Sequence, residues 1–345
     1  MILAIETSCD DTCAAIMKSD ALLSSVVSSQ TDFHARYGGI VPEVASRRHL
    51  ELINPVIDAA LKQADARLNQ VSRVAVTTSP GLIGALLVGV ATAKAIAWAC
   101  GAEMTAVNHL EGHIAANYLA PDPMEPPFIC LIASGGHTSI VFVPGRGSFE
   151  VVGQTLDDAA GEALDKGARL LGLAYPGGAE LDDLARDGDP GYHQFPVALS
   201  RPDNLDFSFS GIKTSLFYYL RAAGKEEIQK HRADIAASYQ SAVVSSLIDK
   251  TLAAAGLLGC RQICLSGGVS ANSELRRRLA DACAGRNIGL RIPPPELCTD
   301  NAAMIASAAR FLPAMPVDDF LRMGAIASGG FAKGGKHARR WKPVT

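Results

Sequence analysis

The chain has 345 residues, a length that fits two domains of about 150 residues each better than one. Apolar residues make up 48% and charged residues 19%, with 32 basic against 35 acidic side chains, which excludes a disordered chain and a uniformly basic nucleic-acid surface. Any RNA partner therefore has to meet a local basic patch. The eight cysteines form no CxxC pair and indicate buried thiols in a reducing compartment, and the N-terminus leaves no room for a signal peptide, so we expect a cytoplasmic protein.

Two similar strand patterns open the two halves of the chain. Residues 2–7 (ILAIET) and 14–17 (AAIM) predict short strands around the polar turn SCDDT. Residues 128–133 (FICLIA) and 139–143 (SIVFV) repeat this plan around SGGHT. The repetition favours a duplicated lobe, with chance similarity of two hairpins as the alternative.

Helical patterns follow the first strands, near residues 43–65 and 80–100. The stretch 82–100 is apolar and long enough to suggest a membrane span. Lys94 lies inside it and would cost about 2.5–3.5 kcal/mol near a bilayer centre. We therefore expect a buried helix, and no membrane as a partner.

The second half alternates helices with strands. A proline-rich loop at 120–127 is the best domain boundary, and helices are expected near 158–172 and 232–255. The strand 262–268 then leads into a helix that starts near Asn272. Strands that alternate with helices predict an α/β fold with mixed sheets.

Two histidines share one face of a predicted helix. His109 and His113 stand at i and i+4 in NHLEGH, so both can reach one metal ion, although such a pair is more often core or surface. A zinc peptidase needs HExxH, with the glutamate next to the first histidine as general base. Glu111 lies two residues past His109, about 200° round the helix, and so points away from the metal face. Asp300 in CTDNAAM could supply an oxygen ligand or could equally be the N-cap of a helix.

Paired glycines follow two apolar strands, in SGGHTS and in SGGVSAN at 266–272. Such turns let a backbone approach phosphate or an adenosine ribose, and ordinary turns are the alternative for each pair. Neither turn fits a Walker loop or a dinucleotide fingerprint. Hydroxyl and carboxyl groups in ETSCDDT could add contacts to phosphates, directly or through a cation.

Eight motifs stand in one order along the chain. They are IETSCDDT, YGGIVPEVASRRH, NHLEGH, SGGHTS, DDAAGEALDKGARLLGLAYPGG, DFSFSGIKT, SGGVSAN and CTDNAAMIA. In this order they resemble the TsaD family (also called Gcp or YgjD) of tRNA N6-adenosine threonylcarbamoyltransferases, in its bacterial form. The resemblance is collinear over essentially the whole chain.

This resemblance implies the fold of actin, sugar kinases and heat-shock chaperone ATPases, with two duplicated α/β lobes and a nucleotide cleft between them. The expected lobes are residues 1–124, completed by 308–345, and residues 125–307.

The resemblance also implies a reaction. A threonylcarbamoyl group passes from its AMP anhydride to the exocyclic N6 amine of the adenosine 3′ of the anticodon, in tRNAs that read codons beginning with A. The implied cofactors are one divalent metal per subunit, Fe²⁺ first and Zn²⁺ second, and an adenine nucleotide. The implied partners are tRNA, a TsaB-type paralogue in a heterodimer, a TsaE-type ATPase and a TsaC-type enzyme that makes the donor.

The family's functional positions map onto this sequence residue by residue. Asp11 matches an acidic position that we expect to matter for activity. The implied metal ligands are His109, His113 and Asp300, and the implied substrate contacts are Ser134, Gly135, Gly136, His137, Thr138, Asp165, Gly178, Asp182 and Asn272.

Two features of the sequence depart from the family pattern. Ser79 stands where the family commonly has glycine, and the C-terminus lacks the usual Trp-Pro ending. Candidate tRNA contacts are the basic clusters Arg47–Arg48, Arg276–Arg278 and, in the tail, Lys333, Lys336, Arg339, Arg340 and Lys342, although such charge runs are more often solvated faces. The competing hypotheses are a metalloendopeptidase, an actin-like ATPase or sugar kinase, and a non-catalytic scaffold.

Overall fold

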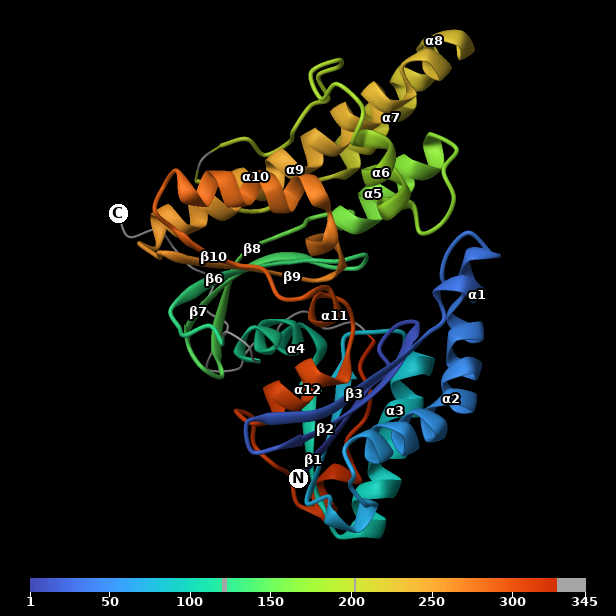
Figure 1. The fold of residues 1–345 in the computed structure, drawn as a ribbon, viewed down its shortest axis with the longest axis vertical. Coiled ribbons are helices and arrows are strands. Elements are labelled where there is room, and N and C mark those ends of the chain that lie inside the picture. Colours follow the sequence, from blue (N-terminus) through green and yellow to red (C-terminus); the bar gives the residue numbers. More distant parts are fainter. Residues whose placement is uncertain (120–122, 202, 328–345) are drawn as a thin grey trace. The chain divides into compact units, whose positions relative to one another are not determined.

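The computed structural model describes residues 1–119, 123–201 and 203–327. The basic tail and part of the predicted boundary loop lie outside the described residues. The described chain forms two compact units, residues 1–125 with 293–327 and residues 126–292. Each unit is built around its own five-stranded mixed sheet (Figure 1).

The sheet of the first unit has the strand order β3-β2-β1-β4-β5. Strand β1 pairs antiparallel with β2 and parallel with β4. The strands are β1 (Ile2–Glu6), β2 (Asp11–Lys18), β3 (Ala21–Ser29), β4 (Arg73–Ser79) and β5 (Glu103–Asn108). The helices are α1 (Thr31–Ala35), α2 (Pro42–Gln63), η1 (Leu68–Gln70), α3 (Ile83–Cys100), α4 (His109–Ala115), η2 (Ala116–Tyr118), α11 (Pro295–Cys298), α12 (Ala302–Ala309) and α13 (Val317–Phe320).

Helices cover both faces of this sheet. Helices α2 and α3 pack against one face and against each other, while α12 packs against β1, β2 and the short helix α4 (Figure 1). The central strands are accordingly buried on both sides and read as continuous apolar runs, with Leu3, Ala4 and Ile5 fully buried. The packing of α12 on α4 brings the C-terminal part of the chain to the end of β5.

The sheet of the second unit has the order β10-β9-β6-β7-β8. Its strands are β6 (Phe128–Ala133), β7 (Thr138–Gly145), β8 (Ser148–Gln154), β9 (Gln262–Ser266) and β10 (Gly289–Arg291). Its helices are α5 (Ala160–Leu170), α6 (Gly177–Ala185), α7 (Ser210–Ala222), α8 (Lys225–Lys230), α9 (Arg232–Leu257), η3 (Gly268–Ala271) and α10 (Ser273–Ala284). The long helix α9 packs against β6 and against α5, α6 and α10.

The two sheets repeat each other strand by strand. In each unit an antiparallel meander of three strands comes first, a fourth strand then adds in parallel to the first strand of the meander, and a fifth adds in parallel to the fourth. Chance similarity of two hairpins does not account for five strands in the same order. The predicted α/β fold with two duplicated halves is therefore confirmed.

Helix α3 differs from the expected buried helix, because only one of its faces is packed. Small and aliphatic residues face β4 and α2, whereas Ile83, Leu87 and Trp98 are 47%, 51% and 69% exposed. Among the described residues α3 is the one helix long and apolar enough for a membrane span. Its Lys94 ammonium donates to two backbone carbonyls of the segment after α13.

Candidate functional site

The histidine pair lies at the start of helix α4. Strand β5 ends at Asn108, whose side chain caps the helix by accepting a hydrogen bond from the Leu110 amide at 2.9 Å. His109 is the first helical residue and His113 follows one turn later, so both buried rings share a face, with centroids 4.7 Å apart. At Gly112 a Cβ would lie 2.8 Å from the side chain of Ile305. Glycine therefore lets α12 lie close to α4.

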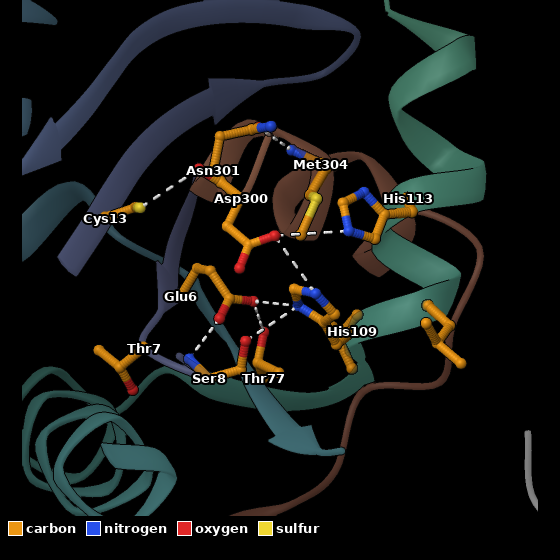
Figure 2. Close-up of polar contacts among 12 residues, drawn as sticks. Glu6, Thr7, Ser8, Cys13, Thr77, His109, His113, Asp300, Asn301 and Met304 are labelled. Carbon is orange, nitrogen blue, oxygen red and sulfur yellow. Dashed lines mark hydrogen bonds and ion pairs between the residues drawn. The ribbon is translucent and has the colours of Figure 1, made fainter. Parts of the chain in front are cut away.

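Asp300 meets both histidines from the turn before α12. Its Oδ1 lies 3.4 Å from Nε2 of His109 and 3.4 Å from Nε2 of His113 (Figure 2). The cap of α12 is Asn301, whose side chain accepts a hydrogen bond from the Met304 amide at 2.9 Å. The alternative that Asp300 is the N-cap is therefore wrong, and its carboxylate is free to serve the histidines.

These three side chains form a group that could hold a metal ion. One ligand atom from each lies within 4.8 Å of the other two. Two imidazole nitrogens and one carboxylate oxygen suit divalent transition metals and Zn²⁺, and they leave coordination positions open for substrate.

Glu6 and Ser8, which the sequence analysis did not link to the histidines, contact His109 on its other side. Its Nδ1 lies 3.2 Å from Glu6 Oε2 and 3.1 Å from Ser8 Oγ. Glu6 also accepts hydrogen bonds from the Ser8 amide at 2.5 Å and from the Thr77 hydroxyl (Figure 2). A carboxylate that directly follows an apolar strand, as in ILAIE, was the available signal for this position.

The cluster is electrostatically coupled. Burial alone would raise the pKa of Asp300, but the charges and hydrogen bonds of His109 and His113 outweigh it and hold that pKa well below its ordinary value. For His109, burial alone would lower the pKa. The charges and hydrogen bonds of the Asp300 and Glu6 carboxylates outweigh burial, and the pKa of His109 lies well above its ordinary value. For His113 burial prevails and the pKa is lowered. Together with Glu6, the group sets two carboxylates whose pKa values are lowered against one histidine whose pKa is raised, so negative charge is in excess and favours a cation.

Asp11 lies in the same unit, at the first position of β2. Its Oδ1 is buried without a hydrogen-bond partner among the described residues. Burial, aided by the nearby carboxylates of Asp10, Asp300 and Glu6, raises the pKa of Asp11 to about 7. A carboxyl group that titrates near neutrality is suited to proton transfer.

Glu111 lies between the two histidines in sequence but does not take part in the histidine cluster. Among the interactions of the described residues, none joins its carboxylate to either histidine ring, and burial raises its pKa to about 7. The base that a zinc peptidase requires is absent from this position.

In the second unit the SGGHT turn joins β6 to β7. The Ser134 amide donates to the His137 carbonyl at 2.8 Å, and Ser134 Oγ accepts from the His137 amide at 3.1 Å. A Cβ at Gly135 or Gly136 would meet open space. Thr138 Oγ1 accepts from the Ala160 amide at 2.8 Å and so ties the turn to the first residue of α5.

The second glycine turn lies against the first. Gly267 has a φ of +88°, and a Cβ there would lie 2.3 Å from the carbonyl oxygen of Ala133, at the end of the neighbouring strand β6. Only glycine fits this position. The structure thus brings the two predicted glycine turns together at the carboxyl ends of the adjacent strands β6 and β9.

The remaining predicted contacts form two separate groups of the same unit. Asp165 Oδ1 accepts from the Gly178 amide at 2.7 Å, at the start of α6. Asp182 and Asn272 bind each other, with Asn272 Nδ2 3.1 Å from Asp182 Oδ1. Both are buried, and Gln240 and Ser273, which sequence reasoning missed, donate to Asp182 as well. Asp182 and Asn272 therefore hold the start of α10 in place.

Comparison with known proteins decides the family. The model of the family described as "TsaD: tRNA N6-adenosine threonylcarbamoyltransferase" matches residues 21–307. The chain belongs to the TsaD family. A relative from Symbiobacterium thermophilum named tRNA N6-adenosine threonylcarbamoyltransferase is 50% identical over 336 residues, which cover 97% of this chain and 98% of the relative.

Solved structures agree on the fold. Component A of (R)-2-hydroxyglutaryl-CoA dehydratase from Acidaminococcus fermentans matches with a TM-score of 0.52 and 15% identity, over 93% of this chain and 99% of that one. HypF from T. kodakarensis matches with a TM-score of 0.61 and 16% identity, over 90% of this chain and 46% of that one. At these identities the likeness concerns the fold alone, and that fold is the actin-like ATPase fold of the resemblance. Family membership makes the chain an enzyme of the transferase class.

Proposed function

We propose that this enzyme transfers a threonylcarbamoyl group from threonylcarbamoyl-AMP to the N6 amine of the adenosine 3′ of the anticodon, in tRNAs that read codons beginning with A. The observation that carries the proposal is the family match over residues 21–307 together with the 50% identical relative of the same name. Neither the peptidase nor the kinase hypothesis receives such support. A cytoplasmic location is part of the proposal, because tRNA is the substrate.

The donor is a mixed anhydride, already activated, with AMP as a good leaving group. Transfer then needs orientation and charge stabilisation more than a strong base. His109, His113 and Asp300 would hold a divalent metal, Fe²⁺ first and Zn²⁺ second, and their nitrogen and oxygen donors fit either. When bound, the ion supplies Lewis-acid chemistry to a substrate oxygen.

The glycine turns of the second unit are proposed to hold the adenylate. Their amides can turn toward phosphate because Gly135 and Gly136 carry no side chain and face open space. Asp165 with Gly178, and Asp182 with Asn272, would shape this site by fixing the starts of α6 and α10.

Asp11 is proposed to accept the proton that the amine loses. Support comes from its unpartnered buried Oδ1 and from its pKa of about 7. A base that titrates near the working pH has both the free form and the driving force for this step.

We further propose three protein partners, a TsaB-type paralogue in a heterodimer, a TsaE-type ATPase and a TsaC-type donor-making enzyme. The exposed apolar face of α3 supports a protein interface, because Ile83, Leu87 and Trp98 would be better placed against another protein than in water. Leu87→Arg should weaken the heterodimer, while Leu257→Arg, a change at a leucine 46% exposed in the other unit, should not.

One assay tests the function. The chain, its partner proteins, threonine, bicarbonate, ATP and tRNA are incubated, and the tRNA is digested and searched for the modified nucleoside. Product that depends on this chain supports the transferase, and its absence with a folded, metal-loaded chain contradicts it. The double variant His109→Ala with His113→Ala should lose metal and transfer while its circular dichroism stays that of the parent chain.

A further inference from the structure

Metal binding by a histidine depends on where its proton sits. The Nε2 atoms of His109 and His113 face Asp300, so these are the atoms that would bind an ion. A neutral imidazole carries one proton, and Nε2 offers a lone pair only when that proton is on Nδ1. The group that accepts a hydrogen bond from Nδ1 therefore decides whether the ring is ready to bind.

Glu6 is placed to accept this hydrogen bond. Its Oε2 lies 3.2 Å from Nδ1 of His109, and the side chain is 1% exposed. A carboxylate only accepts hydrogen bonds, whereas the nearby hydroxyl of Ser8, 3.1 Å from the same nitrogen, can donate or accept. Of these two neighbours, Glu6 is therefore the one that enforces a proton on Nδ1.

The Glu6 carboxylate is itself held in one orientation. Its Oε1 accepts from the Ser8 amide at 2.5 Å, and its Oε2 accepts from the Thr77 hydroxyl. Glu6 ends β1, the central strand of its sheet, and Thr77 belongs to the adjacent strand β4. The acceptor is thus held by strand β4 and by the backbone just after β1, outside helix α4.

We propose that Glu6 is a positioning residue of the metal centre, which holds His109 in the tautomer that presents Nε2 to the ion. This inference rests on the proposed function, since it takes His109, His113 and Asp300 as the ligands. Carboxylates behind metal-binding histidines raise ligand basicity and fix ring orientation, and their loss typically weakens metal affinity by about 10–100-fold.

Glu6→Gln is the sharpest test, because the backbone decides how the amide is oriented. The Ser8 amide can only donate, so the Gln oxygen must stay opposite it and the NH₂ group takes the place of Oε2. That NH₂ donates to Nδ1 of His109 and forces the proton onto Nε2, where it blocks the metal. We expect the dissociation constant for Zn²⁺, measured on the full chain by competition with a chelator, to rise by about 10–100-fold.

Three controls accompany this variant. Glu111→Gln makes the same chemical change on helix α4 at a carboxylate that contacts neither ring, and should leave zinc affinity within about twofold of the parent value. Ser8→Ala removes the other neighbour of Nδ1 and should also have little effect. Glu6→Asp keeps the charge but withdraws it by one methylene, and should weaken zinc binding about tenfold even where Glu6→Gln fails to fold.

A spectroscopic readout separates positioning from loss of structure. In nitrogen-15 spectra of the zinc-loaded chain, the parent protein should show a His109 Nδ1–H protected from exchange, and Glu6→Gln should lack it. Unchanged zinc affinity in both Glu6 variants, or a tenfold loss in Ser8→Ala alone, overturns the inference. Unchanged zinc affinity in the double histidine variant would instead overturn the metal centre of the proposed function.

Discussion

Asp300 and Asn301 are neighbours in sequence, but we assign Asp300 as a metal ligand and Asn301 as the N-cap of α12. Substituting each residue separately tests this assignment. In Asp300→Asn the side chain keeps its size but loses its charge. One oxygen, 3.4 Å from both Nε2 atoms, serves both histidines, so the variant loses the only anionic ligand of the group. The loss should exceed the range for residues behind the ligands, and we expect zinc affinity to fall by at least about 100-fold, or about 2.8 kcal/mol.

The matched variant is Asn301→Ala. It removes the cap that accepts from the Met304 amide at 2.9 Å, without touching either histidine. The free energy of unfolding should fall by about 1 kcal/mol while zinc content stays at one ion per chain. Zinc content is measured by mass spectrometry of the metal, and stability by urea unfolding of the metal-free protein. Zinc affinity unchanged in Asp300→Asn, or lost equally in Asn301→Ala, would refute the assignment.

Three further predictions concern charge, backbone and pH. Asp11→Asn should lower transfer by about 100-fold. It should also stabilise the metal-free chain at pH 8 by on the order of 2–4 kcal/mol, because a pKa raised to about 7 means that the charged form of Asp11 destabilises the folded state. In urea unfolding this gain in stability should shrink toward pH 4. A gain that does not depend on pH would contradict this explanation. Gly267→Ala should destabilise the chain by about 1–3 kcal/mol or more in the same experiment, whereas Gly268→Ala, whose Cβ meets open space, should cost less. Burial alone would raise the pKa of Asp157, but hydrogen bonds from Ser208, Ser210 and the Phe209 amide outweigh burial and lower it. The stability that these bonds give is therefore present above the unfolded pKa of about 4 and is lost as the pH falls through the folded pKa. Asp157→Asn should flatten the pH dependence of stability below pH 4.

Local patterns predicted the elements that carry the site. The strands at the two chain halves, the helices near 43–65 and 232–255 and the histidine face of α4 follow from periodicity and i, i+4 spacing. Helix geometry alone was enough to separate Glu111 from the histidine face, and among the described residues no interaction joins its carboxylate to either ring. Such features depend on residues close together in sequence.

Features that depend on distant packing were out of reach. Whether Asp300 caps a helix or faces His109 depends on which of two adjacent residues turns inward, and the structure assigns the cap to Asn301. Glu6 was quoted in a motif but not identified as a neighbour of His109, because 103 residues separate them. Hydropathy predicted a buried helix for α3 but could not predict that one of its apolar faces is exposed, since a buried and a half-buried helix can have the same composition.

In the proposed function, the cluster of His109, His113 and Asp300 binds a metal on which transfer to tRNA depends. The most direct measurement strips the purified chain of metal, adds back Fe²⁺ or Zn²⁺, and follows the modified nucleoside in tRNA supplied with threonylcarbamoyl-AMP and the partner proteins. We predict no product from the stripped chain and recovery of product with one ion per chain. Product at the full rate from a chain shown to be free of metal would contradict the claim.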